Sequence, residues 1–312
     1  MKRKYTHIFG PVPSRRLGYS LGVDLIPFKT CTYDCIYCQL GKTTNNTIVR
    51  KEYYPVDEIC REIHDKLKEN VKIDYVTLSG SGEPTLYSRI DEIIGYIKSK
   101  TQTPVAVLTN GSLLYEKNVQ NQIKTADLVV PSLDAPDENL FNYVNRPNAD
   151  LNFIKIIQGL IEFRKVYVGK IWLEIFLLDG VTSIQAEIEK LADIAAEINP
   201  DKIQLNSVAR PTAESYACPV SKDHMLELKK CFKGNVEIIA DFNKIHDAAF
   251  FQSGKNEIIN LLKRRPCSVE DIQSGLNMHK NEVLKYIEDL VKENIINSKV
   301  QNDKKYYYLS CK

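Results

Sequence analysis

Long uncharged apolar runs are missing from this sequence of 312 residues. A membrane helix needs about 18 or more consecutive apolar residues, whereas stretches such as Ile171–Leu178 are interrupted by charge. The basic N-terminus, Met1–His7, is not followed by an apolar core with a cleavage site, so no secretory signal is expected. We therefore expect a cytoplasmic protein with no membrane partner.

Cysteine is scarce, and a strong net charge is absent. Eight cysteines are too few for a small disulfide-stapled fold, and a reducing cytosol keeps them as thiols. The formal charge of +2 is the average of +6 over residues 1–50, −7 over 51–254 and +3 over 255–312. A chain-wide surface for polyanions is therefore not supported, but each end of the chain has the charge to approach phosphate.

Apolar runs alternate with amphipathic stretches over the first 240 residues, which is typical of a parallel sheet covered by helices. The predicted strands are Ser20–Ile26, Ile73–Leu78, Val105–Thr109, Leu128–Ser132, Lys170–Leu177 and Lys202–Leu205. The predicted helices are Val56–Lys68, Ser88–Ser99, Leu113–Lys124, Leu151–Phe163, Ser183–Ile198 and Ser221–Phe232. Six such units predict an α/β fold, either open and doubly wound or curved toward a barrel, with its site in the loops after the strands.

A different pattern follows a connector over residues 241–254. Residues 255–312 predict helices near Glu257–Lys263, Ser268–Gly275 and Met278–Asn294, and then two strands around an Asn302-Asp303 turn. A small core is predicted from Ile258, Ile259, Leu262, Val269, Ile272, Leu276, Val283, Ile287, Leu290 and Ile295. This order of elements is that of a winged helix-turn-helix domain, so we expect domains at 1–240 and 255–312 joined by a linker.

Three cysteines, Cys31, Cys35 and Cys38, lie within eight residues after the first predicted strand. Thiolates select zinc, copper(I) or iron–sulfur clusters. A closed zinc site needs four ligands, and no fourth cysteine or histidine lies nearby, although a distant residue remains an alternative. Three cysteines on one loop are suited to three irons of a cubane [4Fe–4S] cluster, leaving the fourth iron for another ligand.

The Cys31-x3-Cys35-x2-Cys38 motif, with Tyr37 before its last cysteine, resembles the cluster motif of the radical S-adenosylmethionine (SAM) superfamily. The lead-in Gly10–Gly18 and the exit Cys38–Gly41 are similar to those of wyosine-synthetase-like Fe–S oxidoreductases. The resemblance covers residues 9–215. It implies a partial (β/α)6 TIM-like barrel that reductively cleaves SAM to a 5′-deoxyadenosyl radical, which abstracts a hydrogen atom from the substrate. It also implies an external one-electron donor of the flavodoxin or ferredoxin type.

The loops after the predicted strands contain residues that the resemblance connects with the cofactor. The segment Ser79–Pro84 resembles the superfamily's Gly-Gly-Glu-Pro segment, with Ser81 in place of the first glycine. The resemblance implies cofactor contacts by Tyr37, Ser81, Gly82, Glu83, Asn110, Ser132, Asp134 and Asn206. Turn capping is the alternative role for Asn110, Ser132 and Asp134.

Several other residues have two interpretations each. Glu174 faces either the barrel interior or solvent, and Asp24 is either an interior carboxylate or a satisfied core group. Arg15 and Arg16 hold an anion or form ordinary surface. Arg210 follows the sixth strand, where we expect contact with adenine or substrate. Cys218 is a thiol for substrate chemistry or has no role, and Cys60, Cys231, Cys267 and Cys311 have no motif spacing.

The substrate is not determined by these motifs. The resemblance favours a tRNA base of the wyosine type. A winged helix also suits binding of a protein or peptide, so radical modification or activation of a bound protein or peptide is an alternative. A third possibility, from another class, is an Fe–S redox sensor that binds DNA. No catalytic side chain and no oligomeric state can be assigned from the residues.

Overall fold

The structure is a computed structural model that describes residues 5–69, 71–239, 255–276, 278, 280–301 and 303–310. The predicted connector 241–254 and Cys311 lie outside the described residues. In this part of the chain no helix is long and apolar enough to cross a bilayer.

One eight-stranded sheet forms the body of the protein, with the order β1-β2-β5-β6-β7-β8-β9-β10. Its strands are β1 (Ile8–Ser14), β2 (Gly18–Val23), β5 (Tyr75–Leu78), β6 (Val105–Thr109), β7 (Leu128–Pro131), β8 (Lys170–Leu177), β9 (Lys202–Ser207) and β10 (Val236–Ile238). The β1–β2 pair is antiparallel, and the other neighbours are parallel. Since β1 and β10 do not pair with each other, the sheet is an open, partial barrel, as predicted.

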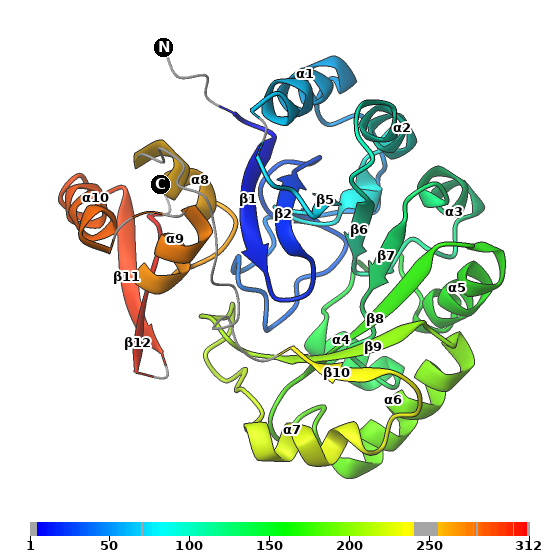
Figure 1. Ribbon diagram of the computed structural model, residues 1–312. Coiled ribbons are helices and arrows are strands. Elements are labelled where there is room, and N and C mark those ends of the chain that lie inside the picture. The colour runs from blue at the N-terminus through cyan, green and yellow to red at the C-terminus, as the bar shows by residue number, and fades with distance from the viewer. Residues whose placement is uncertain are drawn as a thin grey trace.

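Helices cover the outer face of this sheet (Figure 1). They are α1 (Val56–Leu67), α2 (Ile90–Lys100), α3 (Lys117–Ile123), α5 (Phe153–Val166), α6 (Gln185–Ile198) and α7 (Lys222–Lys229). The short 3-10 helix η1 (Pro84–Leu86) follows β5, and the short helix α4 (Glu138–Val144) follows β7. Buried residues recur at helical spacing, as in Ile90, Ile93, Ile94 and Ile97 of α2. These apolar stripes bury against the strands, so packing rather than intrinsic propensity holds most of the helices in place.

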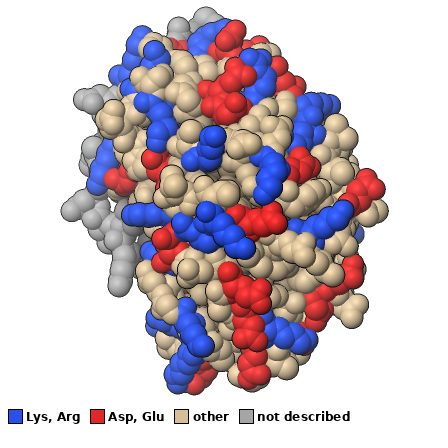
Figure 2. All heavy atoms as spheres, turned by 90° about the vertical axis from the view of Figure 1, so that its right-hand side faces the viewer, with Lys and Arg blue, Asp and Glu red and all other residues tan. Residues whose placement is uncertain are grey.

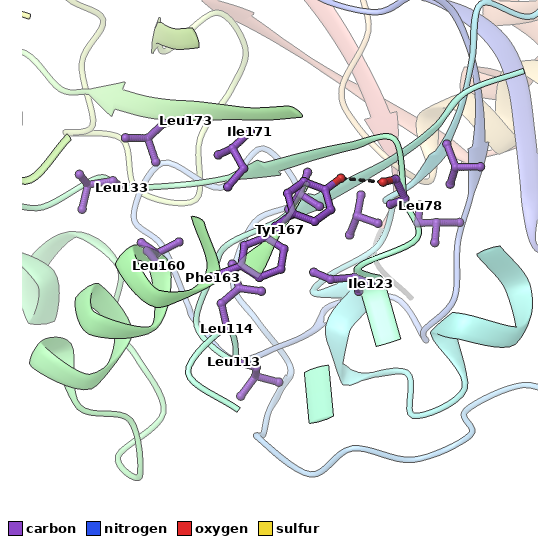
Figure 3. Close-up of a cluster of buried hydrophobic side chains, with 14 of the residues drawn as sticks. Leu78, Leu113, Leu114, Ile123, Leu133, Leu160, Phe163, Tyr167, Ile171 and Leu173 are labelled. Carbon is purple, nitrogen blue, oxygen red and sulfur yellow. Dashed lines mark hydrogen bonds between the residues drawn. The ribbon is translucent and has the colours of Figure 1, made fainter. Parts of the chain in front are cut away.

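The core between sheet and helices is apolar and tightly filled. Figure 3 shows Leu160 and Phe163 of α5 among side chains of the strands, with Tyr167 beside them. Phe163 and Tyr167 stack with ring centroids 4.8 Å apart, and the Tyr167 hydroxyl donates to the Ala126 carbonyl at 2.7 Å. The buried hydroxyl thus has the partner that it needs.

Fully buried and less buried side chains alternate along β8, so its residues can be assigned to the two faces of the sheet. Ile171, Leu173, Ile175 and Leu177 are buried in the core under the helices. Because successive side chains of a strand point to opposite faces, the residues between them, Glu174 included, lie on the concave face. The sequence left this orientation open, and the structure assigns Glu174 to the barrel interior.

The C-terminal residues form α8 (Lys255–Leu262), α9 (Val269–Leu276), α10 (Lys280–Lys292) and a hairpin of β11 (Ile296–Gln301) and β12 (Lys304–Leu309). All ten residues predicted for its core lie in or against one hydrophobic cluster. The order of elements is that predicted for a winged helix, and assignment to that domain class stays a prediction.

This C-terminal unit packs against β1 (Figure 1). Val12 of β1 belongs to its hydrophobic cluster, and the Tyr306 hydroxyl donates to the Ala209 carbonyl at 2.8 Å. Arg264 lies 4.1 Å over the Phe9 ring and 3.6 Å from Asp24. The contacts therefore combine apolar, cation–π and ionic interactions across the boundary.

Six of the described elements before residue 240 were not predicted: β1, β10, α4, η1 and the two-residue strands β3 (Thr30–Cys31) and β4 (Asn45–Asn46). β1 contains two prolines, which usually argue against a strand but are tolerated at a sheet edge. β10 has three residues and α4 has seven, which is too short for a clear periodic signal. The remaining strands and helices were predicted with boundaries that differ by a few residues at most.

Candidate functional site

The three cysteines lie in the long connection between β2 and α1. Cys31 ends β3 (Thr30–Cys31), which pairs in parallel with β4 (Asn45–Asn46). Cys35 and Cys38 follow in a turn in which the Cys38 amide donates to the Cys35 carbonyl at 3.0 Å. The Ile36 amide donates to the Val144 carbonyl at 2.9 Å. The last residue of α4 is therefore hydrogen-bonded to the cysteine loop.

Two asparagine side chains direct N–H groups toward the cysteine sulfurs. The Asn110 amide nitrogen is 3.6 Å from Cys31 Sγ and donates to Thr32 Oγ1 at 2.7 Å. The Asn145 amide nitrogen is 3.5 Å from Cys35 Sγ. Such donors stabilise thiolate and cluster charge and tune the potential of iron–sulfur centres.

The thiols are in a setting that disfavours free thiolates. Burial, with Glu83 adding to it, raises the pKa of Cys31 to about 12. Burial likewise raises the pKa of Cys35 and of Cys38. Three soft sulfur donors on one loop fit a bound cluster, whose positive irons would hold them as thiolates. Among the described residues no three His, Cys, Asp or Glu side chains are grouped around one metal position, and a cubane does not require this because each cysteine binds a different iron.

Tyr37 and Asp134 meet beside the cysteine loop. The Tyr37 ring stacks on Phe176 of β8 with centroids 4.0 Å apart, and its hydroxyl donates to Asp134. Asp134 also accepts from the Asn145 amide at 3.0 Å and from the Phe176 backbone at 3.1 Å. Burial raises the pKa of Asp134 to about 6, although these donors oppose the shift. Asp134 thus connects the loop after β7 to the cysteine turn.

The Ser81–Glu83 segment follows β5 and is held by buried polar contacts. The Ser81 hydroxyl donates to Asp24, and its amide donates to the same carboxylate at 3.1 Å. At Gly82 any Cβ would lie 1.8 Å from the Thr30 carbonyl oxygen, so only glycine fits where this segment passes the cysteine loop. Both residues therefore set the position of the loop.

Glu83 joins this segment to β6. Its Oε1 accepts from Thr109 Oγ1 at 2.6 Å and from the hydroxyl and backbone N–H of Thr85 at 2.5 and 3.0 Å. Its Oε2 accepts from the backbone N–H of Asn110 at 2.7 Å. Burial raises the pKa of Glu83, and these hydrogen bonds work against the shift. A carboxylate oxygen has two lone pairs, so Oε2 has capacity for one further donor.

A second polar cluster lies on the concave face between β8, β9 and the β1–β2 turn. Arg16 pairs with Glu174 at 2.6 Å, and the Asn206 amide donates to the other Glu174 oxygen at 2.7 Å. Arg15 in turn donates to Asn206 Oδ1 at 3.2 Å. Burial disfavours the charge of Glu174, but Arg16 holds its pKa below the usual range. Glu174 is thus an ionised interior group.

The other predicted residues have simpler surroundings. The backbone of Ser132 forms an isolated parallel β-bridge with Glu174, and its N–H donates to the Thr109 carbonyl at 3.2 Å. Cys218 is exposed in the loop after β9, whereas Cys60 and Cys267 are buried. Asp24 is a buried group satisfied by Ser81 and Arg264, in agreement with the core interpretation.

Sequence reasoning missed two residues that complete these clusters. Asn145 contacts both Cys35 and Asp134, but it ends a helix that the sequence pattern did not reveal. Arg264 reaches Asp24 from the C-terminal unit. No local motif marks either residue, because each acts on a partner that is distant in the chain.

Comparison with known proteins agrees with this geometry. Residues 25–195 match the model of the radical SAM superfamily. The chain belongs to this superfamily of enzymes, which use a [4Fe–4S] cluster and SAM together with an electron donor. The fold and the three-cysteine loop described above have the features that these cofactors require.

Two curated relatives each match more than nine tenths of the chain. A UPF0026 protein of Methanocaldococcus jannaschii is 34% identical over 311 residues, which are 97% of this chain and 96% of that protein. The chain therefore also belongs to the UPF0026 proteins. A protein of Brachyspira hyodysenteriae named GTPase Obg is 40% identical over 304 residues, and the chain spans 45% of its length. The solved structure of TYW1 with a lysine-pyruvate adduct bound has a TM-score of 0.52 and 19% identity, covering 71% of this chain and 74% of that one.

Proposed function

We propose that this chain generates a 5′-deoxyadenosyl radical at Cys31, Cys35 and Cys38 and uses it to take a hydrogen atom from a nucleic-acid substrate, with a tRNA base as the first candidate. The observation that carries the radical chemistry is the meeting of the cysteine loop with Glu83, Asn110 and Asp134 at the carboxyl ends of the strands. When bound, the reduced cluster supplies the electron that cleaves SAM.

The residues of the chain would bind and orient the cofactor. Glu83 Oε2 has acceptor capacity for the ammonium of the methionine part, and Gly82 brings the backbone close to the cysteine loop. Asn206 and Ser132, at the ends of β9 and β7, are our candidates for contacts with ribose and adenine. The stacked Tyr37 and Phe176 rings shield the cysteine turn on one side. These groups position the cofactor and exclude water, while the cofactor supplies the radical chemistry.

The charge distribution favours an anionic substrate near the C-terminal unit rather than on the outer helices. Figure 2 shows Lys and Arg mixed with Asp and Glu over the helical face, which offers no continuous basic surface for a polyanion. The hairpin of the C-terminal unit has the exposed residues Lys299 and Lys304. A flavodoxin or ferredoxin as the electron donor and a cytoplasmic location also belong to this proposal.

The test of the radical chemistry is anaerobic. The protein is reconstituted with iron and sulfide, SAM and dithionite are added, and 5′-deoxyadenosine is measured by mass spectrometry. We expect product from the parent protein, none from Cys35→Ala, and unchanged product from the exposed control Cys218→Ser. A fully loaded cluster that yields no 5′-deoxyadenosine would overturn the proposal and favour a redox sensor.

The substrate is tested in the same assay. We expect bulk tRNA, but not a mixture of peptides, to accelerate 5′-deoxyadenosine formation and to acquire a mass change. Acceleration by peptides alone would replace the nucleic-acid substrate with a protein or peptide substrate.

A further inference from the structure

A cavity of about 340 Å³ lies where the C-terminal unit meets the open side of the barrel. Pro13 of β1 and Ile238 of β10 both line it, so the two outer strands of the sheet contribute to one space. The C-terminal unit supplies the facing wall through Asp271 of α9 and Tyr306 of β12. In Figure 1 this unit stands beside β1, next to the open edge of the barrel.

The wall of this cavity is strongly cationic. Among the described residues, five cationic side chains line it against two acidic ones. The cations are Arg15, Arg210, Lys222, Arg265 and Lys304. Arg210 is 4% exposed and lies 3.6 Å from Asp271. Burial, followed by repulsion from Arg210 and Arg16, lowers the pKa of Arg15 to about 10.

Apolar side chains form another part of the wall, beside the hydroxyl groups of Ser207, Ser268, Ser274 and Tyr306. Val208, Val220, Met225, Ile238 and Ile239 come from the barrel side of the cavity. The volume falls at the lower end of the roughly 300–1,000 Å³ that small-molecule sites occupy, and such sites combine apolar walls with a few polar groups. The cavity is thus suited to a ligand with an anionic head and a flat or apolar body.

The cavity adjoins the proposed reaction site. Arg15 lines the cavity and donates to Asn206 at 3.2 Å, and Asn206 donates to Glu174 at 2.7 Å. Ser207, the next residue of β9, lines the cavity directly. A ligand held here would lie beside the end of β9, at the carboxyl edge of the sheet where the site is expected.

We propose that this cavity is a binding site for a phosphate ester of nucleotide size, which is the part of the substrate that the enzyme holds for hydrogen abstraction. The lining includes the guanidinium groups of Arg15, Arg210 and Arg265, and the planar fork of N–H donors in such a group matches the several oxygens of a phosphate. A carboxylate has two oxygens and is satisfied by one such fork. The substrate role rests on the proposed radical function, whereas the binding site is tested without turnover.

The experiment measures binding of AMP and UMP to the reconstituted full chain by equilibrium dialysis, with saturating SAM present. Adenosine and uridine serve as matched ligands without phosphate, and we expect them to bind about tenfold more weakly or worse. Arg265→Gln removes a charged donor and should weaken nucleotide binding about tenfold or more. Lys304→Gln should weaken it severalfold. Equal binding of nucleosides and nucleotides would overturn the proposal.

Lys305→Gln is the matched control for Lys304→Gln. The two lysines are adjacent on β12 and both exposed, but their side chains point to opposite faces of the strand. Lys304 lines the cavity with Tyr306, whereas Lys305 lies 5.6 Å over the Tyr307 ring. We expect no change in nucleotide affinity for Lys305→Gln. Equal losses in both lysine variants would show a general charge effect and overturn the proposal.

Further arms identify the source of the phosphate. If a short RNA oligonucleotide binds much more tightly than AMP and depends on Arg265, the ligand is a nucleotide within nucleic acid; equal affinities support a free nucleotide. Binding of an acidic peptide, with no nucleotide binding, overturns the proposal, as does displacement of AMP by SAM.

SAM cleavage without nucleotide binding refutes this inference alone. Nucleotide binding without SAM cleavage refutes only the radical function.

Discussion

Replacing Arg264 with methionine tests whether one buried ion pair docks the C-terminal unit on the barrel. Arg264 and Asp24 have side chains that are 7% and 9% exposed, with Nε and Oδ2 3.6 Å apart. Methionine retains an apolar stem against Phe9 but removes the positive charge and the donor to the Asn260 carbonyl. Asp24 would then be a buried carboxylate without its cation.

The expected loss follows from this geometry. Two unit charges 3.6 Å apart attract by about 4.6 kcal/mol at an effective dielectric constant of about 20. Part of this loss is offset, because the variant no longer has to bury a charged guanidinium. Removal of one partner from a buried ion pair generally costs about 3–5 kcal/mol of stability. We therefore expect Arg264→Met to lower the free energy of unfolding by about 3 kcal/mol at neutral pH.

The loss should depend on pH. Burial raises the pKa of Asp24 in the folded protein, and Arg264 is the largest influence that opposes this shift. Without Arg264 the folded-state pKa rises further above the unfolded value. A carboxyl group whose pKa is higher in the folded protein than in the unfolded chain stabilises the fold at a pH below its pKa in the unfolded chain. This stabilisation disappears as the pH rises through its pKa in the folded protein. Arg264→Met should therefore regain stability relative to the parent as the solution is acidified.

Two probes separate docking from barrel unfolding during urea denaturation. Trp172 in β8 is the single tryptophan and reports on the barrel through its fluorescence, while far-UV circular dichroism reports on all helices. We expect the dichroism transition of Arg264→Met to shift to lower urea and to separate from the fluorescence transition. The double variant Asp24→Asn/Arg264→Met should recover part of the loss, because no buried charge remains.

Two results would refute this reasoning. One is a loss below about 1 kcal/mol in Arg264→Met, comparable with that of the exposed control Arg61→Met, for which we expect a change within about 0.5 kcal/mol. The other is a double-mutant cycle, completed with Asp24→Asn alone, in which the loss in the double variant equals the sum of the two single losses, since the two residues would then show no coupling.

Three further substitutions probe the site. Glu83→Gln places an amide N–H₂ group among donors, so it should cost about 1–3 kcal/mol of stability and weaken SAM binding in equilibrium dialysis; unchanged affinity would contradict a cofactor role. Asn145→Leu removes a donor to Cys35 Sγ, so the midpoint potential in an EPR-monitored titration should fall; an unchanged potential would exclude this hydrogen bond as a tuning element. Arg16→Met leaves Glu174 without its cation and should lower the melting temperature, with partial recovery in Arg16→Met/Glu174→Gln; no recovery would rule out the ion pair as the cause.

Local patterns predicted the parts of this fold that depend on local chemistry. Val105–Thr109 and Lys170–Leu177 are strands with the predicted boundaries, because continuous or alternating apolar runs identify them without tertiary information. β1 was missed because its prolines are compatible with a strand only at a sheet edge, and edge position is a property of the assembled sheet. The cysteine spacing predicted the loop but not the amides that contact it.

The contacts between clusters could not be predicted, and they change the role of the C-terminal unit. Arg264 reaches Asp24, which holds Ser81 beside the cysteine loop, while Tyr306 fixes the Ala209 carbonyl in the loop after β9. These contacts link the unit to the loops after two different strands of the barrel. A detachable binding module would need neither buried ion pairs nor shared core residues such as Val12. The C-terminal unit is therefore part of the site's framework, and a variant that undocks it should disturb the Ser81 loop even when every cysteine is intact.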